Sequence, residues 1–311
     1  MDKKLLDPEM PISENGKVYH LGLGPKDNLP QNIFLVGDPS RVFKVAKYFD
    51  SEPVIRQNRE FITAIGNYQG LAIAVIGTGI GPANTEIVAN ELHILNEYDH
   101  TKKEWRPPTR QLRIIRLGTC ATPQKNIPVG SLAISMLAIG FDNLDKHYPF
   151  YSNHTLITTT SKAINSVMNN ACSYVSMPSP GMLYFLTEAC KKIGLELQVG
   201  KGYYCGITAS TPGFYNPQGR QIGRLPYGPF NNIQNILASF QCFALKIINI
   251  EMESAIMFRI LSEILQYRAG TICAVLANRA TGEIVSPEEY EASIDRCIQA
   301  GLEAMKLLNN K

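Results

Sequence analysis

Residues 32–41, NIFLVGDPSR, form a short apolar run that ends in a turn containing Gly37 and Pro39. The next residues, VFKVAKYF (42–49), place apolar side chains at helical spacing. The stretch therefore predicts a buried β-strand, a loop and a helix. Two β-rich runs at 60–81, around a turn with Gly and Asn, then lead into an amphipathic helix at 82–98.

The same alternation continues to the end of the chain. Buried strands are expected at 112–119, 131–140, 197–208 and 270–278, with a polar, Pro-rich connection at 99–111. Helical periodicity occurs around 160–172, 181–193, 251–267 and 286–308. Strands that alternate with helices indicate a central sheet covered on both faces, with ligands bound in loops at the strand ends.

The composition is that of a compact folded chain. The 311 residues are 45% hydrophobic and 18% charged, far from the composition of disordered proteins. Residues 1–17 are polar and broken by Pro and Gly, so we expect an N-terminal extension outside the core. The remainder, 18–311, is expected to form a single domain.

Charge and cysteine usage exclude several classes of partner. The net charge of +3 is too small to indicate a nucleic-acid or membrane surface, and no apolar run has the length of a signal peptide or membrane span. The seven cysteines are scattered and odd in number, which indicates free thiols in a reducing, cytoplasmic compartment. No metal site is expected, because neither Cys nor His shows ligand spacing.

Arginines stand near Gly or polar backbone at several strand ends. They occur in VGDPSR, in RQNRE and in RLGTCAT, and guanidinium groups beside exposed N–H groups bind phosphate oxygens well. The alternative is that each is a solvated surface charge. GTGIGP (77–82) lacks the spacing of a nucleotide loop and is interpreted as a close strand-to-helix turn.

Two further segments carry polar groups in unusual settings. NIEMESA (249–255) places Glu251 and Glu253 at the start of a helix, where they either cap the helix or accept hydrogen bonds from a sugar diol. GITASTPGFYNPQGR (206–220) places Phe214 ahead of Gln218 and Arg220 in a Pro- and Gly-marked loop after a strand.

Taken together, these motifs have a characteristic order. VYHLGL, VGDPSRV, NREF, GTGIGPANTEI, IIRLGTC, GITASTPGFYNPQGR, IEMESA and AVLANR follow one another between about residues 18 and 305. Their order and spacing resemble the uridine phosphorylases of the hexameric-type nucleoside phosphorylase superfamily. FYNPQGR looks like the family's pyrimidine-recognition loop, and EMES looks like its ribose motif.

The resemblance implies a three-layer α/β/α fold on a central mixed, twisted sheet. It also implies reversible phosphorolysis of uridine to uracil and ribose 1-phosphate, in pyrimidine nucleoside salvage. Inorganic phosphate is then a co-substrate, and no redox or organic cofactor is needed. Active sites would be shared between subunits of a homodimer or homohexamer, with a monovalent cation near Glu60 at the interface.

The resemblance also assigns roles to individual residues. Three of them, Arg116, Arg220 and Glu253, would act directly in catalysis. The phosphate site would comprise Gly37, Arg41, Arg59, Arg116 and Thr119. The base would meet Phe214, Gln218, Arg220 and Arg279, and the ribose would meet His20, Met252 and Glu253. His20 and Arg59 would come from the neighbouring subunit.

Other functions remain as alternatives. A purine nucleoside phosphorylase or nucleosidase would carry an acid after the late strand to protonate a purine, but Ala277 stands there. A non-catalytic nucleoside-binding paralogue would not need every one of the matched residues. The chain departs from the family at Ala121, where Gly is usual, and in reading FYNPQGR for the bacterial FYPGQER.

Overall fold

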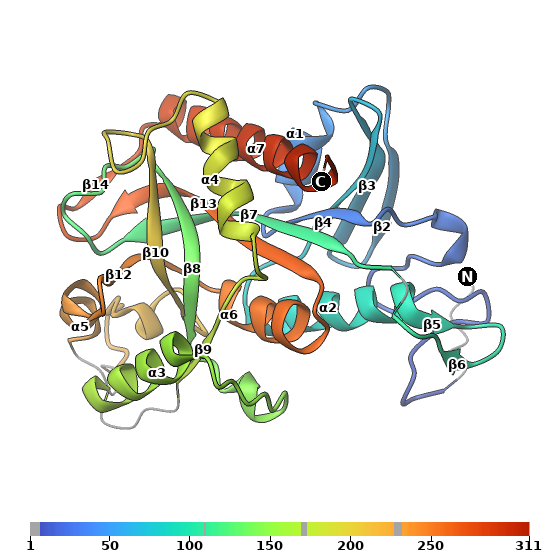
Figure 1. The fold of residues 1–311 in the computed structure, drawn as a ribbon, viewed down its shortest axis with the longest axis horizontal. Helices are drawn as coiled ribbons and strands as arrows, with labels where there is room; N and C mark the ends of the chain where they lie inside the picture. Colours follow the sequence, from blue (N-terminus) through green and yellow to red (C-terminus); the bar gives the residue numbers. More distant parts are fainter. Residues whose placement is uncertain (1–6, 109, 169–172, 227–231, 311) are drawn as a thin grey trace. The chain divides into compact units, whose positions relative to one another are not determined.

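The computed structural model describes residues 7–108, 110–168, 173–226 and 232–310. The chain divides into two compact units, Met1–Ile114 and Ile115–Lys311. In each unit, strands form a mixed sheet with helices packed against it (Figure 1). One strand, β7 (Arg113–Thr122), crosses from the first unit into the second.

The first unit contains β1 (Asn32–Val36), α1 (Pro39–Ala46), β2 (Val54–Asn58), β3 (Phe61–Tyr68), β4 (Leu71–Gly77), α2 (Pro82–Glu97), β5 (Tyr98–Asp99) and β6 (Glu104–Trp105), with a short 3₁₀ helix, η1 (Pro25–Asp27). β1 and β4 are parallel, whereas β3 runs antiparallel to β4 and β2 antiparallel to β3. The loops after β1 and β4 therefore leave the sheet at the same edge.

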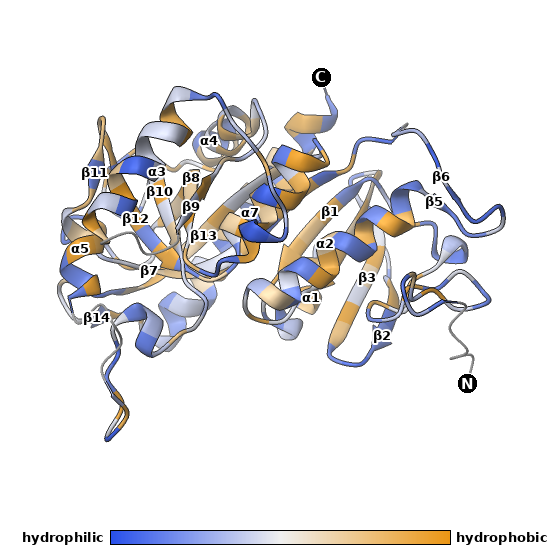
Figure 2. Ribbon diagram, turned by 90° about the horizontal axis from the view of Figure 1, so that it is seen from below, coloured by the Kyte–Doolittle hydropathy of each residue, from blue (hydrophilic) through white to orange (hydrophobic). Residues whose placement is uncertain are grey.

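The strand, loop and helix predicted at 32–49 are confirmed. All residues of β1 are buried, and Asp38 caps α1 by accepting the N–H of Ser40 at 2.8 Å. GTGIGP is the strand-to-helix turn that the sequence indicates, since Gly79 and Gly81 have φ of 73° and 97° and α2 starts at Pro82. Figure 2 shows hydrophilic and hydrophobic residues alternating along α2.

Two expectations for the first unit were wrong. The turn between β3 and β4 lies at Gln69 and Gly70, whose N–H groups donate to Asp50 at 2.8 and 2.9 Å, and not at Gly66 and Asn67, which belong to β3. The connection expected at 99–111 contains a hairpin, β5–β6, in which the Trp105 ring stacks on the His93 ring of α2. Both differences depend on side-chain contacts between distant residues, which the spacing of apolar residues does not reveal.

The predicted N-terminal extension is partly described. Ile12 forms a bridge with Val18, and both side chains are buried. The division into an extension, 1–17, and a single domain, 18–311, stays a prediction.

The second unit contains β8 (Leu132–Gly140), η2 (Leu144–Lys146), α3 (Thr155–Val167), β9 (Tyr174–Ser176), α4 (Met182–Lys192), β10 (Tyr203–Ser210), η3 (Asn216–Gln218), α5 (Ile233–Ser239), β11 (Gln241–Cys242), β12 (Leu245–Glu251), α6 (Ser254–Met257), the π-helical η4 (Phe258–Ile264), β13 (Arg268–Asn278), β14 (Glu283–Ile284) and α7 (Pro287–Asn309). β10 lies between β8 and β12 and is parallel to both, and β13 is antiparallel to β8 (Figure 1). The helices α4 and α7 pack against β13 and against each other.

The strands and helices predicted for this unit occur, with shifted bounds. β10 starts at Tyr203 because residues 197–202 form a turn, and the helix expected around 160–172 is α3, although residues 169–172 lie outside the description. The helix expected from 251 begins only at Ser254, because Glu251 still pairs with Ser210 in the sheet. In this unit β9, α5, β11 and β14 were not predicted, and neither was β2 of the first unit.

Three observations bear on the chemistry expected from composition. The six cysteines within the described residues are free thiols, five of them buried; Cys172 lies outside those residues. Among the described His, Cys, Asp and Glu side chains, no group of three or more could hold a metal ion. In the described ranges, no helix is both long and apolar enough to pass through a bilayer.

Candidate active site

The strand β7 carries a buried arginine in the part that belongs to the second unit. Arg116 points its guanidinium into the protein, and its Nη1 donates to Cys273 Sγ at 3.3 Å. A methyl group at Gly118 would collide with that guanidinium and with the Cys273 sulfur. The Gly of the R-x-G-T motif is therefore needed for close approach, and Thr119 follows it, half-buried, on the same strand.

The two glutamates of NIEMESA have different roles. Glu251 is the last residue of β12, and its carboxylate accepts the N–H groups of Glu253 and Ser254 at 3.0 Å. It therefore caps α6, as one interpretation of the sequence held. The Glu253 side chain accepts no capping hydrogen bond from α6. Met252 lies half-buried between them.

The carboxylate of Glu253 contacts the arginine of β7. Nη2 of Arg116 donates to Oε2 of Glu253, and Nη1 lies 3.1 Å from Oε2 of Glu251. Burial by itself lowers the pKa of Arg116, but the carboxylates of Glu253 and Glu251 outweigh it and raise that pKa above its usual value. The structure thus joins a residue predicted for phosphate with one predicted for ribose.

The loop after β10 forms a compact polar cluster. Gln218 is 2% exposed, and its Nε2 donates to Thr211 Oγ1 at 2.9 Å. Its Oε1 accepts from Arg220 Nη1 at 2.5 Å, and Arg220 Nη1 also donates to the carbonyl of Phe214. The Arg220 guanidinium lies 4.0 Å from the centre of the half-exposed Phe214 ring, which fixes its plane.

A second arginine completes this cluster. Nη1 of Arg279 donates to the Gln218 carbonyl at 2.9 Å, and the Arg279 N–H donates to the carbonyl of Thr122, at the end of β7, at 2.8 Å. Burial, and then the like charge of Arg220, lower the pKa of Arg279 to about 10. Two guanidinium groups therefore contact Gln218, Arg220 at the side-chain amide and Arg279 at the main-chain carbonyl.

Thr211 connects the loop to the glutamates. Its N–H donates to the Glu251 carbonyl at 2.9 Å, while its hydroxyl accepts from Gln218. The residues predicted for base and ribose in the second unit therefore belong to one hydrogen-bonded chain. Sequence reasoning missed Ser210, Thr211 and Cys273. The signal for Ser210 and Thr211 was their position at the end of β10, whereas Cys273 lies in the middle of β13 and carried no such signal.

In the first unit, the GDP-x-R loop lies where parallel strands end. Gly37 follows β1, and a methyl group built on it would approach the Gly79 carbonyl to 3.4 Å. Arg41 lies in the first turns of α1 and is 5% exposed. The two loops that leave this edge are thus in close contact at their glycines.

His20 and Arg59, predicted to serve a neighbouring subunit, lie side by side in the first unit. Asn58 donates to the carbonyls of Tyr19 and His20 at 2.9 and 2.7 Å, and the guanidinium of Arg59 lies 5.5 Å from the Tyr19 ring centre. The His20 ring is held by Glu91 Oε1 at 2.8 Å from Nδ1. The two residues predicted to serve a neighbouring subunit, His20 and Arg59, therefore lie close together in this unit.

The structure also places the stretch where a purine-specific enzyme is expected to carry an acid. Ala277 lies in β13 opposite Ile284, and the next residue, Asn278, is buried. Asn278 Nδ2 donates to the carbonyls of Gln124 and Ile127 at 3.0 and 2.9 Å. Neither Ala277 nor Asn278 is a carboxylate, and the Asn278 amide holds the neighbouring backbone in place.

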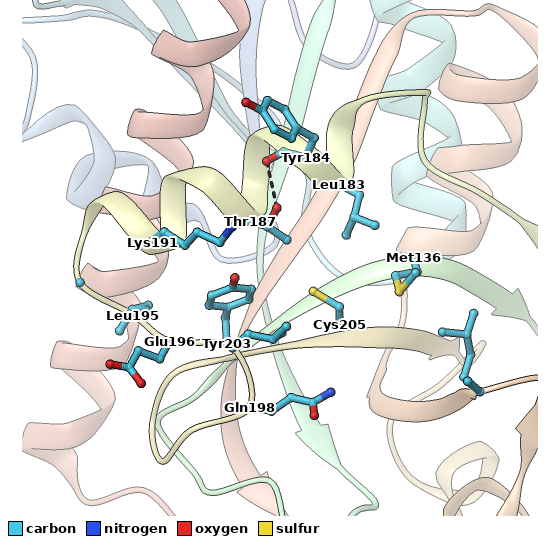
Figure 3. A pocket seen from close by; sticks show the side chains of 14 residues that line it. Met136, Leu183, Tyr184, Thr187, Lys191, Leu195, Glu196, Gln198, Tyr203 and Cys205 are labelled. Atoms are coloured by element: carbon cyan, nitrogen blue, oxygen red, sulfur yellow. Dashed lines mark hydrogen bonds between the residues drawn. The ribbon is translucent and has the colours of Figure 1, made fainter.

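A cavity of about 900 Å³ in the second unit lies apart from these residues. Figure 3 shows Tyr203 and Cys205 on β10 facing the α4 residues Thr187 and Lys191. None of the predicted site residues lines it. The lysine among its lining residues, Lys191, pairs with Glu188 at 2.7 Å.

Comparison with known proteins identifies the family. A family model described as the phosphorylase superfamily matches residues 32–309. The chain belongs to this superfamily. A uridine phosphorylase of Thermococcus kodakarensis is 30% identical over 310 residues, which are 99% of this chain and 92% of that protein. Another from Haemophilus influenzae is 27% identical over 295 residues, 94% of this chain and 98% of that protein.

Solved structures agree with this membership of the phosphorylase superfamily. A nucleoside phosphorylase of Trypanosoma brucei, described as showing uridine phosphorylase activity, superposes with a TM-score of 0.85 at 32% identity. The match covers 96% of this chain and 99% of that one. The resemblance inferred from the motifs and the predicted α/β fold with a mixed, twisted sheet are confirmed. The roles of individual residues stay predictions.

Proposed function

We propose that this member of the phosphorylase superfamily is a uridine phosphorylase, a pentosyltransferase that converts uridine and inorganic phosphate to uracil and ribose 1-phosphate. The observation that carries the proposal is the chain of contacts from Gln218 through Thr211 to Glu251, and from there through Arg116 to Glu253. It links the groups expected at the base, ribose and phosphate. The names of the relatives from Thermococcus and Haemophilus support the same substrate.

The base cluster suits uracil. The Gln218 amide uses one N–H and one lone pair inside the protein, so one donor and one acceptor remain for the imide edge of a pyrimidine. As the glycosidic bond breaks, negative charge develops on uracil, and Arg220 and Arg279 would stabilise it. Phe214 would pack against base or sugar.

The ribose and phosphate groups would then be positioned from the strand ends. Glu253 would accept hydrogen bonds from the 2′ and 3′ hydroxyls, next to Met252. Arg116 and Thr119, together with Gly37, Arg41 and Arg59, would hold phosphate as the nucleophile. This is positioning of a reactant and not acid–base chemistry. No redox or organic cofactor is required for such a displacement.

The assembly proposed is a homodimer or homohexamer in which His20 and Arg59 complete the neighbouring subunit's site. Their shared position around Asn58 supports donation as a unit. The monovalent cation is proposed near Glu60, which is exposed and lies 3.6 Å from Arg59. Pyrimidine salvage in the cytoplasm would be the setting of the reaction.

The activity is tested by uridine cleavage with and without inorganic phosphate. We expect uracil release only with phosphate, together with ribose 1-phosphate. Equal release without phosphate would identify a hydrolase, and turnover of inosine but not uridine would support the purine alternative. No turnover of any nucleoside would support the non-catalytic paralogue.

Subunit sharing is tested by mixing two inactive variants. His20→Ala/Arg59→Ala should lack the donated groups, and Arg220→Ala should lack the base site. Refolding or exchanging them together in equal amounts should restore about a quarter of the sites in a dimer. Absence of any restoration in mixed oligomers would contradict sharing.

A further inference from the structure

The side chain of Glu251 is unusually well satisfied for a capping residue. It is 1% exposed, accepts hydrogen bonds from the backbone N–H groups of Glu253 and Ser254 and from the hydroxyl of Ser210, and forms an ion pair with Nη1 of Arg116. A neutral acceptor would suffice for the two backbone groups. The guanidinium is the donor that needs the full charge.

The guanidinium of Arg116 is held at two ends. Nη1 lies 3.1 Å from Glu251, and Nη2 donates to Glu253. Glu253 is also the carboxylate assigned to the ribose hydroxyls, so binding of the sugar competes for it. Glu251 has no such second task, because its remaining lone pairs face Ser210 and the start of α6.

We propose that Glu251 is a positioning residue for the phosphate-binding arginine: it keeps Arg116 in place when Glu253 turns to the ribose. Ser210 orients Glu251, and the N–H of Ala255 donates to the Ser210 oxygen at 3.1 Å. The groups that hold the Glu251 carboxylate in place thus come from the ends of β10 and β12 and from the start of α6. The inference rests on the proposed function, since it assigns phosphate to Arg116.

The arrangement makes a specific prediction about kinetics. Loss of the Glu251 charge would let Arg116 follow Glu253 or turn away, so phosphate would lose an oriented partner. The KM for phosphate should rise about tenfold or more, as expected for loss of one charge-assisted hydrogen bond. The KM for uridine should change less than about threefold, because Glu253 keeps its carboxylate.

The test compares Glu251→Gln with Glu251→Asp and with a matched control, Glu263→Gln. Glu263 is also buried, lies 3.1 Å from an arginine and accepts a backbone N–H, but its arginine is not a predicted site residue. We expect the phosphate KM to rise in E251Q, to rise less in E251D, and to stay unchanged in E263Q. If E251Q does not fold, Ser210→Ala should give a smaller rise of the same kind.

A double-mutant cycle shows whether Glu251 acts through Arg116. In an Arg116→Lys background, E251Q should raise the phosphate KM by less than about twofold further. Additive effects of the two changes would overturn the proposal. So would a fall in melting temperature with an unchanged phosphate KM, or equal rises in the KM of uridine and of phosphate.

Failure of the proposed function would be seen separately. Calorimetric titration of the full chain with inorganic phosphate needs no uridine turnover. If the wild-type protein binds phosphate and E251Q binds it about tenfold more weakly, the inference stands even where uridine is not cleaved. If both proteins bind phosphate equally, Glu251 does not position Arg116.

Discussion

The second unit buries two arginines against carboxylates, and they differ in what surrounds them. Arg116 meets Glu251 and Glu253, two carboxylates on the segment between β12 and α6. Arg259 meets one, Glu263, four residues further along the π-helical segment η4. Both arginines are 5% exposed. Burial and ion pairing therefore do not distinguish them.

The other groups around Arg116 and Arg259 do distinguish the two arginines. Arg259 lies 5.3 Å from the ring centres of Phe150 and Tyr174, and donates to the carbonyls of Phe150 and Val175 at 3.3 and 3.1 Å. None of these partners is a predicted site residue. Burial raises the pKa of Glu263 to about 7, in opposition to Arg259, so this pair is only partly charged near neutrality.

The comparison separates an arginine packed into the core from one whose partners include predicted site residues. Around Arg116, Glu251 caps α6, and Glu253 is the carboxylate proposed for the ribose. Around Arg259, aromatic faces and carbonyls take the place of the second carboxylate. A buried ion pair alone is thus a weak indicator of function.

The largest difference is expected when each arginine is removed. Arg116→Ala leaves two buried carboxylates without a counter-charge and should lower the free energy of unfolding by about 3–5 kcal/mol. Arg259→Ala should cost less, because Glu263 can take up a proton. Denaturant unfolding at pH 7 measures both.

The KM for phosphate is a second measurement that distinguishes these two variants. Arg116→Ala should also weaken the use of phosphate, whereas folded Arg259→Ala should keep the wild-type KM for phosphate. A lower free energy of unfolding for Arg259→Ala than for Arg116→Ala would contradict the distinction.

The next effect is a pH dependence that belongs to Glu263. Its carboxyl has a pKa of about 7 when folded, against 4.5 as the reference value. Between these values the folded state holds a proton that the unfolded chain releases, so the free energy of unfolding falls as pH rises, by about 3 kcal/mol in all. Glu263→Gln should remove this slope between pH 5 and pH 8.

The control for that slope is Glu303→Gln. Hydrogen bonding by Lys192 first, and then by Lys306, lowers the pKa of Glu303, so it stays ionised across this range. Its replacement should leave the slope unchanged. If the free energy of unfolding of Glu263→Gln and of wild type changes in parallel from pH 5 to pH 8, the raised pKa of Glu263 is disproved.

The smallest effect is expected at the sulfur beside Arg116. Cys273→Ala removes an acceptor 3.3 Å from Nη1, and should lower the free energy of unfolding by about 1 kcal/mol and raise the phosphate KM about threefold. Cys190→Ala, which removes an equally buried thiol from the second unit, is the matched control. Identical phosphate KM values for the two variants would show that the sulfur has no part in holding Arg116.

Much of the fold follows from local patterns. The strand, loop and helix at 32–49 were predictable because buried strands, Pro and Gly turns and helical spacing are short-range signals. The β5–β6 hairpin and the short helix α5 were not, because brief elements depend on contacts made elsewhere. The start of α6 was misplaced for the same reason, since Glu251 is kept in the sheet by Ser210.

The sequence by itself determined the family and the candidate residues, because the order of motifs such as FYNPQGR and EMES is a property of the chain. Only the tertiary structure decided how the two glutamates divide their roles: Glu251 caps α6, and Glu253 faces Arg116. Both have the same chemistry and lie two residues apart. What separates them is the end of β12, where pairing with the sheet directs the carboxylate of Glu251 to the backbone of α6, while the carboxylate of Glu253 accepts from Arg116.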